Sequence, residues 1–375
     1  MTNKNSDTTR TLDYIKEVFP WLHGHQAKAM TALIEAILAK QTGNQAELAR
    51  TQGNQEAGCK RFSRLIHNDR IETRKLTEAI CQQALAQVPA HGKVRFSIDW
   101  TIEGKQHLLT ISLQVGRRAL PIFWRAYDED VLKGRMRRYE QAVIKRAFKL
   151  ILQAIPAARI RLTADRGFPQ AGLFSLLESL KIRYVIRVRS AVHVCFRGHW
   201  QALRKLRFCG NERHRRLGRI VYCKSDPHGL WVTMSRARNK KGQLETWYLV
   251  SNHDFGAEPA AREYGRRFSC EEGFRDAKWY LGFKQARIGS IKAWARLFCF
   301  FAVSLMILTT LGTFVLLNSG NGAAWLRKVA SRRKGRCELS LVTAMHKLLQ
   351  KNWSLLNRLL PHTKFKLEYD LAKVS

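Results

Sequence analysis

The chain has 375 residues, of which 66 are Lys or Arg and 29 are Asp or Glu, so its formal net charge is +37 at neutral pH. This length accommodates two or three domains, and a hydrophobic fraction of 45% excludes a disordered chain. Such an excess of cations repels itself in a compact fold unless it meets a polyanion. DNA or RNA is therefore the expected partner, and an acidic membrane surface is the weaker alternative.

Eight cysteines are spread along the chain, and none stands in a CxxC pair, which argues against a zinc ribbon. The first ten residues, MTNKNSDTTR, lack the apolar core of a signal peptide. We therefore expect reduced thiols in a cytoplasmic protein that associates with the nucleoid when it is bound to DNA.

One segment is apolar enough to compete for a membrane interpretation. Residues 297–317, LFCFFAVSLMILTTLGTFVLL, carry no charge and are long enough to span a bilayer. The same segment also suits the core of a large globular domain. Because no second span accompanies it, we favour a buried helix and expect no membrane partner.

Residues 1–90 have helical periodicity and are expected to form an N-terminal DNA-binding domain. The predicted helices there span residues 26–40, 45–50, 56–68 and 71–88. The third follows a Gly-Asn turn and carries Lys60, Arg61 and Arg64. This pattern is compatible with a helix-turn-helix reader of duplex DNA, and equally with many other small helical domains.

From residue 91 to residue 190 the periodicity becomes that of a mixed α/β sheet. The predicted strands span residues 94–100, 108–115, 119–125, 160–164 and 184–189. The predicted helices span residues 139–155 and 170–180. We expect this segment to be the first part of a catalytic core.

Residues 191–252 are rich in Arg, Gly and Trp and predict a β-rich insertion. After a short helix over 201–206, its predicted strands span residues 220–224, 230–235 and 247–251. Residues 253–318 return to the core with a helix over 260–280 and the apolar helix. Residues 319–375 begin with a basic run, Arg332-Arg333-Lys334, and end in a helix over about 339–360. We expect that last segment to serve dimerisation or DNA contact.

The segment 264–278, YGRRFSCEEGFRDAK, has an unusual distribution of charge. Read as a helix, it places five polar residues on one face, within a sector of about 60° for the first four. These residues are Tyr264, Arg267, Glu271, Lys278 and Arg275. A helix that enters a core normally shows an apolar stripe at this spacing. This face is therefore either solvated and salt-bridged or the lining of a groove for metal and phosphate.

Two aspartates occupy positions that strands rarely give to a carboxylate. Asp99 lies within the first strand of the predicted sheet, and Asp165 follows the strand over 160–164, where ligands of open α/β sheets gather. Glu271 adds a third carboxylate from a third element. Three carboxylates without His or Cys suit Mg²⁺ or Mn²⁺, and two such ions roughly 3.5–4 Å apart can activate water against a phosphodiester. Either aspartate alone also fits a turn, a cap or an ion pair; together they favour phosphodiester chemistry.

Three motifs make this pattern specific: SIDWT around Asp99, TADRGF around Asp165, and the spacing Y-x2-R-x3-E-x6-K from Tyr264 to Lys278. They resemble the bacterial insertion-sequence transposases of the DDE class, and the last is similar to the YREK signature of one branch. The resemblance covers residues 90–320, and RFSRLIHN resembles that branch's N-terminal DNA-binding region. It implies an α/β fold with an RNase H-like mixed-sheet core, interrupted by a β-rich insertion, between a helical N-terminal domain and a helical C-terminal segment.

The resemblance also implies roles for individual residues. Asp99, Asp165 and Glu271 would hold two Mg²⁺ or Mn²⁺ ions. The residues that would grip phosphates at the transposon end are Tyr264, Arg267 and Lys278, with Arg275 and Arg166 as helpers. Trp247 lies on the strand before the signature, where members of the branch stack a flipped base; ordinary strand packing is its equal alternative. Cys270 and Gly273 flank the glutamate, and glycine is a weak helix former.

The function implied by the resemblance is cut-and-paste DNA transposition of an insertion sequence. It comprises hydrolysis at the element ends, a hairpin intermediate, and strand transfer into target DNA. The partners would be the terminal inverted repeats, the target DNA and a second copy of the chain in a dimeric synaptic complex. A nuclease of the same fold that never joins ends, and an inactive DNA-binding relic, are the alternatives.

Overall fold

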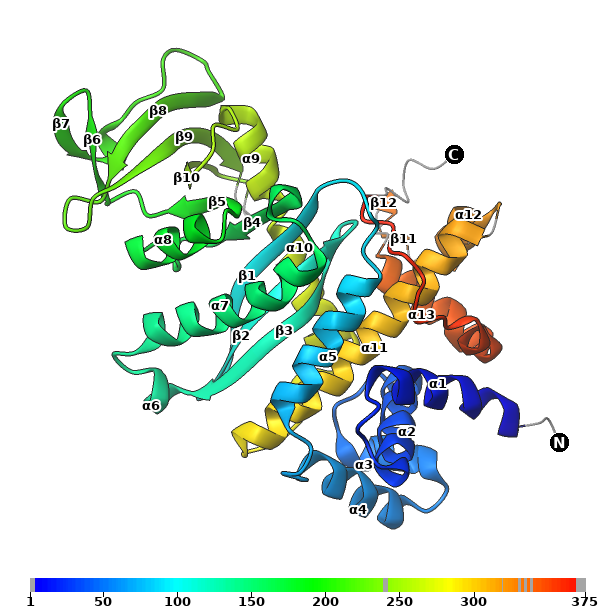
Figure 1. The fold of residues 1–375 in the computed structure, drawn as a ribbon. Helices are drawn as coiled ribbons and strands as arrows, with labels where there is room; N and C mark the ends of the chain where they lie inside the picture. Colours follow the sequence, from blue (N-terminus) through cyan, green and yellow to red (C-terminus); the bar gives the residue numbers. More distant parts are fainter. Residues whose placement is uncertain are drawn as a thin grey trace. The chain divides into compact units, whose positions relative to one another are not determined.

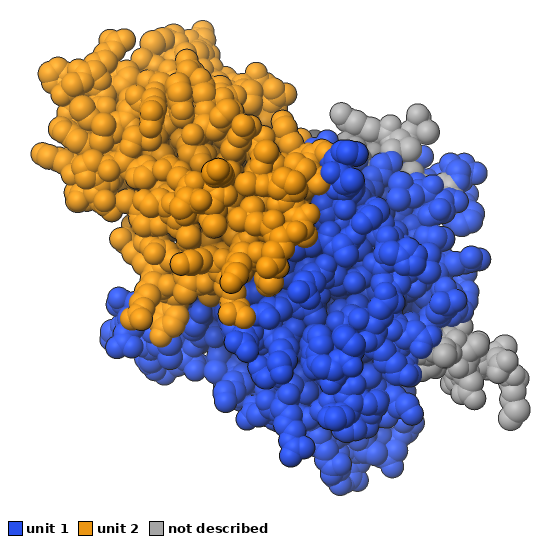
Figure 2. Space-filling model, in the orientation of Figure 1, with its two compact units in different colours: residues 1–91, 100–135, 269–375 blue, residues 92–99, 136–268 orange. Residues whose placement is uncertain are grey.

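The structure is a computed structural model, and it describes residues 4–238, 242–318, 320–329, 332–333, 336–337 and 340–368 (Figure 1). The chain divides into two compact units (Figure 2). Unit 1 comprises residues 1–91, 100–135 and 269–375, and unit 2 comprises residues 92–99 and 136–268. The chain thus crosses between the units four times. One crossing, after residue 99, lies inside a strand, and another, after residue 268, lies within the segment 264–278. The five domain boundaries expected from the sequence are not tested by this division and stay predictions.

Unit 1 begins with five helices. They are α1 (Lys4–Val18), α2 (Gly24–Lys40), α3 (Gln45–Ala49), α4 (Gln55–Ile66) and α5 (Thr73–Ala86). The side chains of Asn44 and Asn54 accept hydrogen bonds from the first turns of α3 and α4, which explains where these helices begin. The four predicted helices of this region are confirmed, and α1 is an addition to them.

The core of unit 1 forms around a hairpin and one long helix. Strands β2 (Gln106–Val115) and β3 (Arg118–Asp128) pair in antiparallel fashion. With β1 (Val94–Glu103) they follow the order β3-β2-β1, and the short helix α6 (Glu129–Leu132) comes after β3. Helix α11 (Ile291–Asn318) packs on β3 and against α2, α5 and α13 (Leu341–Lys351) (Figure 1). Among the described residues, it is the one helix long and apolar enough to cross a bilayer, and 83% of its most apolar stretch is buried. The prediction of a buried core helix is confirmed.

The C-terminal part of unit 1 differs from its prediction. It contains α12 (Gly322–Val329), the short pair β11 (Arg332–Arg333) and β12 (Arg336–Cys337), and α13 (Leu341–Lys351). Lys334 of the predicted basic run lies outside the described residues. The predicted helix over 339–360 is too long, because Asn352 leaves the helical region at φ −142° and a 3₁₀ segment, Trp353–Arg358, follows.

Unit 2 is built on a mixed sheet in the order β1-β4-β5-β10-β9-β8-β6-β7. Its strands are β1 (Val94–Glu103, shared with unit 1), β4 (Ile160–Ala164), β5 (Arg183–Val188), β6 (His193–Phe196), β7 (His199–Ala202), β8 (His214–Tyr222), β9 (His228–Arg238) and β10 (Leu244–Ser251). Strands β1, β4 and β5 are parallel, and the remaining pairs are antiparallel. This mixed α/β arrangement is consistent with an RNase H-like domain.

Three helices complete unit 2: α7 (Met136–Ala154), α8 (Ala171–Ser179) and α9 (Ala257–Gly265). The expected richness in strands from residue 191 to residue 252 is confirmed. Because β10 pairs with β5, these strands extend the sheet of unit 2. The predicted helix over 201–206 is wrong: strand β7 ends at Ala202, and a single 3₁₀ turn, Leu203–Lys205, follows it.

The predicted single helix over 260–280 is also wrong. Helix α9 ends at Gly265, Arg266 and Arg267 form a turn, and α10 (Phe268–Arg275) then leads into a π-helical turn, Asp276–Tyr280. Glycine is a weak helix former, and at this break the Arg267 side chain turns inward and is buried. The common face predicted at 100° per residue therefore does not exist as one helical face.

Candidate active site

The two predicted aspartates lie next to each other on neighbouring parallel strands of unit 2. Strands β1 and β4 pair in register up to Ile98 with Ala164, and Asp99 and Asp165 are the next residues of the two strands. Adjacent strands lie about 4.8 Å apart, so the register brings both aspartate backbones together where β4 ends. Ligands of α/β sheets bind at this carboxyl edge.

Arg267 forms an ion pair with Asp99, with 3.2 Å between its Nη1 and the carboxylate Oδ2. The side chain of Arg267 is only 5% exposed and that of Asp99 is 20% exposed. The guanidinium carbon also lies 5.8 Å from the ring centre of Tyr264 and 5.1 Å from that of Phe268. A cation this deeply buried is stable only when it is paired, so Arg267 fixes the first aspartate rather than presenting its charge to solvent.

Tyr264 contacts the second aspartate. Its hydroxyl donates to Asp165 Oδ1 at 3.4 Å, and the same oxygen accepts the backbone N–H of Arg166 at 2.6 Å. Burial raises the pKa of the Tyr264 phenol, with the nearby Arg267 opposing that rise. The phenol therefore remains a hydrogen-bond donor at neutral pH, and the exposed side chain of Arg166 extends from the turn that follows β4.

Trp247, on strand β10, packs inside unit 2. It is 9% exposed, and its ring meets that of Tyr264 edge to face at 5.1 Å. Its Nε1 donates to Glu245 at 2.6 Å, and Glu245 in turn pairs with Arg187 at 3.0 Å. This is the strand packing that the sequence left open as an alternative. Base stacking stays a prediction, and it requires the ring to leave its cluster.

The remaining signature residues belong to unit 1. Glu271 lies in the first turn of α10. Lys278, on the π-helical turn, pairs with Glu103 at 3.0 Å, and the exposed Arg275 pairs with Glu272. The two unusual neighbours of the glutamate have a structural reason. Cys270 is buried against Ser112 of β2, and a Cβ on Gly273 would lie 2.1 Å from the carbonyl oxygen of Ala119 on β3.

The donor chemistry of the aspartate pair fits a divalent cation. Asp99 and Asp165 offer only carboxylate oxygens, the ligands that Mg²⁺ and Mn²⁺ prefer, at an edge that solvent reaches. Within the described ranges, no group of three or more His, Cys, Asp or Glu side chains is arranged to hold a metal ion. The structure thus brings together two of the three predicted ligands in unit 2, while Glu271 belongs to unit 1.

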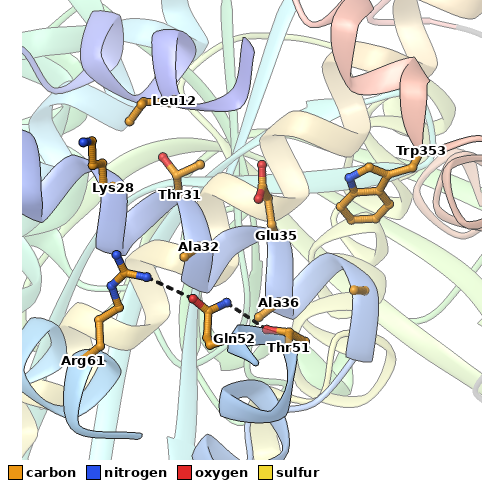
Figure 3. Close-up of a pocket in the computed structure, with 11 residues that line it drawn as sticks. Leu12, Lys28, Thr31, Ala32, Glu35, Ala36, Thr51, Gln52, Arg61 and Trp353 are labelled. Carbon is orange, nitrogen blue, oxygen red and sulfur yellow. Dashed lines mark hydrogen bonds between the residues drawn. The ribbon is translucent and has the colours of Figure 1, made fainter. Parts of the chain in front are cut away.

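The predicted basic residues of the N-terminal region surround two adjoining hollows between helices. Lys60, Arg61 and Arg64 of α4 line one of about 570 Å³. Arg61 also lines the other, of about 470 Å³, where it donates to Gln52 at 3.1 Å (Figure 3). Lys28 of α2 lines both hollows. Lys28 is not among the residues predicted from the sequence, although its place on the polar side of an amphipathic helix is a signal that identifies it.

A mixed sheet with two carboxylates at the carboxyl edge of adjacent parallel strands suits an enzyme of metal-assisted phosphodiester chemistry. Residues 144–306 match the family described as the transposase DDE domain. The matched range contains Asp165 and the whole segment 264–278, and it begins after Asp99. No curated protein matches the chain. The family match supports a DDE-type transposase, an enzyme that acts on DNA and belongs to a class that generally uses divalent metal ions.

Proposed function

We propose that this protein is a cut-and-paste DNA transposase of an insertion sequence, from the branch with the YREK signature. The observation that carries the proposal is the placement of Asp99 and Asp165 side by side on parallel strands. Arg267 and Tyr264, two residues of the signature, each contact one member of that pair. The family match over residues 144–306 supports the same class of enzyme.

In this proposal Asp99, Asp165 and Glu271 hold two Mg²⁺ or Mn²⁺ ions. When bound, the ions supply the activation of water and the stabilisation of the leaving oxygen. Arg267 holds and orients the Asp99 carboxylate, because it forms a charge-assisted hydrogen bond with it in a protected environment. Tyr264 donates to Asp165 Oδ1 and so restrains the orientation of that carboxylate.

The cations around these acids neutralise the DNA backbone. Arg166 and Arg275 are exposed, so they can reach phosphates. Lys278 would contact a phosphate after exchanging its partner Glu103. The basic hollows beside α4, with Lys28 added to the predicted residues, provide a contact surface for duplex DNA at the element end.

The reaction alternates hydrolysis with exchange of one phosphodiester bond for another. Water breaks a P–O bond at the element end and leaves a 3′-hydroxyl and a 5′-phosphate. The 3′-hydroxyl attacks the opposite strand, which gives a hairpin on the element and a free flanking end. Hydrolysis reopens the hairpin, and the regenerated 3′-hydroxyl attacks target DNA. Two ends must be inserted together, so the working form is a dimer on DNA, acting in the cytoplasm at the nucleoid.

The test uses the purified chain with duplex DNA taken from the sequence that flanks its gene. With Mg²⁺, we expect a nick, then a hairpin, then joining of a pre-cut end to target DNA. Asp99→Asn, Asp165→Asn and Glu271→Gln should each abolish nicking and retain DNA binding, whereas Glu258→Gln, an exposed glutamate of unit 2, should nick normally. Cleavage without joining would instead identify a nuclease, and binding without cleavage a relic. Normal nicking by Asp99→Asn would overturn the proposed site.

A further inference from the structure

Arg118, the first residue of β3, joins three elements of unit 1 around helix α10. Its Nη1 lies 2.6 Å from Glu272 of α10, and its Nε lies 3.0 Å from Asp276 of the π-helical turn. The same Nε donates to the hydroxyl of Ser340 at 3.0 Å. Ser340 is the N-cap of α13. One guanidinium therefore holds the helix, the turn that follows it and the start of a C-terminal helix.

This cluster is mostly protected from water. The side chain of Arg118 is 18% exposed and that of Asp276 is 5% exposed. Glu272 is 33% exposed and shares its carboxylate with Arg275 at the surface. The planar fork of arginine can serve two carboxylates and a hydroxyl at once, which the single ammonium of lysine cannot do in the same geometry.

Small residues of α10 make its contact with strands β2 and β3. Cys270 and Gly273 let α10 approach β2 and β3 so closely that a side chain on Gly273 would collide with the backbone of Ala119. At 100° per residue, Glu271 is about 160° around the helix from Gly273. The contacts with β2 and β3 therefore turn Glu271 to the face of α10 that points away from the hairpin.

Helix α10 has eight residues and continues directly into the π-helical turn. An isolated helix of this length is only marginally stable. π-helical turns are rare in proteins, and those that occur are often found at functional sites. The rotation of α10, and with it the direction of Glu271, thus depends on contacts from outside the helix. Arg118 supplies the charged contacts at two positions four residues apart.

We infer that Arg118 is a positioning residue that acts through Glu272 and Asp276 to set the direction of the Glu271 carboxylate. The inference rests on the proposed role of Glu271 as a metal ligand. Nothing in the sequence singled out Arg118, because it lies outside the motifs and 154 residues from its partner Glu272. Its neighbour Arg117 is exposed and gives a matched control one position away.

The experiment compares Arg118→Gln with Arg117→Gln in the full chain. Binding of Mn²⁺ is measured without turnover by electron paramagnetic resonance, alongside single-turnover nicking at several Mn²⁺ concentrations, DNA affinity and the melting temperature. Residues that orient a metal ligand typically change affinity 10- to 100-fold. For Arg118→Gln we expect at least about tenfold weaker Mn²⁺ binding with unchanged DNA affinity, and for Arg117→Gln we expect the parent values. Unchanged Mn²⁺ binding and nicking by a folded Arg118→Gln would overturn the inference.

Glu272→Gln keeps the proposal testable if Arg118→Gln does not fold, because it leaves the contacts of Arg118 with Asp276 and Ser340 in place. It should weaken Mn²⁺ binding in the same direction, and parent-like binding would count against positioning. Arg118→Lys should bind Mn²⁺ little better than Arg118→Gln does, since lysine cannot bridge the same groups. Glu271→Gln separates the two hypotheses. If it nicks DNA normally, the proposed function fails; if it is inactive while Arg118→Gln is normal, only the positioning role fails.

Discussion

Arg267 donates to Asp99 across 168 residues of sequence, at 3.2 Å. The arginine comes from the turn between α9 and α10, and the aspartate from the strand at the centre of the predicted site. This ion pair connects the first acidic motif with the signature inside unit 2.

Arg267→Gln should destabilise unit 2 by roughly 3 kcal/mol, because it leaves the partly buried Asp99 carboxylate without its cation. Urea denaturation followed by tryptophan fluorescence measures this loss. Arg266→Gln, at the exposed neighbouring position, should cost less than about 0.5 kcal/mol. Equal costs for the two variants would contradict the importance of the buried pair. Nicking activity should fall with Arg267→Gln even under conditions in which the variant remains folded.

Asp276 predicts a pH dependence of stability. Burial raises the pKa of this carboxyl from 3.8 to about 6, although Arg118 opposes the rise. A carboxyl with a raised folded-state pKa contributes stability that is fully present below about pH 4 and is lost as the pH rises through about 6.

Asp276→Asn removes that titration. The free energy of unfolding of the variant, minus that of the parent, should therefore increase by up to about 3 kcal/mol between pH 4 and pH 7. Denaturation curves at half-unit pH intervals measure the difference. Asp130→Asn, at an exposed aspartate of the same unit, is the matched control. A difference for Asp276→Asn that stays constant over this range would contradict the prediction.

Trp247→Ala should cost about 3 kcal/mol of stability, because the ring fills a cluster with Tyr264, Val185 and Leu249. Trp247→Phe keeps most of that packing and separates stability from DNA chemistry. If the ring also stacks on an unpaired base, Trp247→Phe and Trp247→Ala slow hairpin formation more than the first nick. Equal slowing of both steps assigns Trp247 to packing alone. Gel analysis of nicked and hairpin products distinguishes these results.

The basic hollows of the N-terminal helices predict salt-dependent DNA binding. Lys28→Gln and Arg64→Gln should each weaken DNA affinity and reduce the slope of log affinity against log salt by about one. Lys40→Gln, at the exposed end of α2 and outside both hollows, should change the slope less. Fluorescence anisotropy from low to moderate salt measures all three. An unchanged slope for Lys28→Gln would show that α2 is not part of the DNA-contact surface.

Much of the architecture was predictable because it depends on local patterns. Short runs of apolar and β-branched residues defined β1, β4 and β5, and helical periodicity defined α2 and α7. The positions of Asp99 within β1 and of Asp165 directly after β4 followed from those strands. The interruption of the signature helix was not predictable from its periodicity. Whether Arg267 faces outward or inward depends on a carboxylate that is distant in sequence, and helical periodicity carries no information about a distant partner.

The sequence by itself determined the strong positive charge, the order of most elements and the identity of the acidic and YREK residues. It also contained the small residues Cys270 and Gly273, but the motif did not show why small residues are required at these positions. Only the tertiary structure decided that Tyr264 and Arg267 are buried against the two aspartates, that Trp247 is packed, and that Arg118 holds α10. The physical reason is that burial and ion pairing depend on which surfaces meet when the chain folds, and local periodicity does not specify the partner surface.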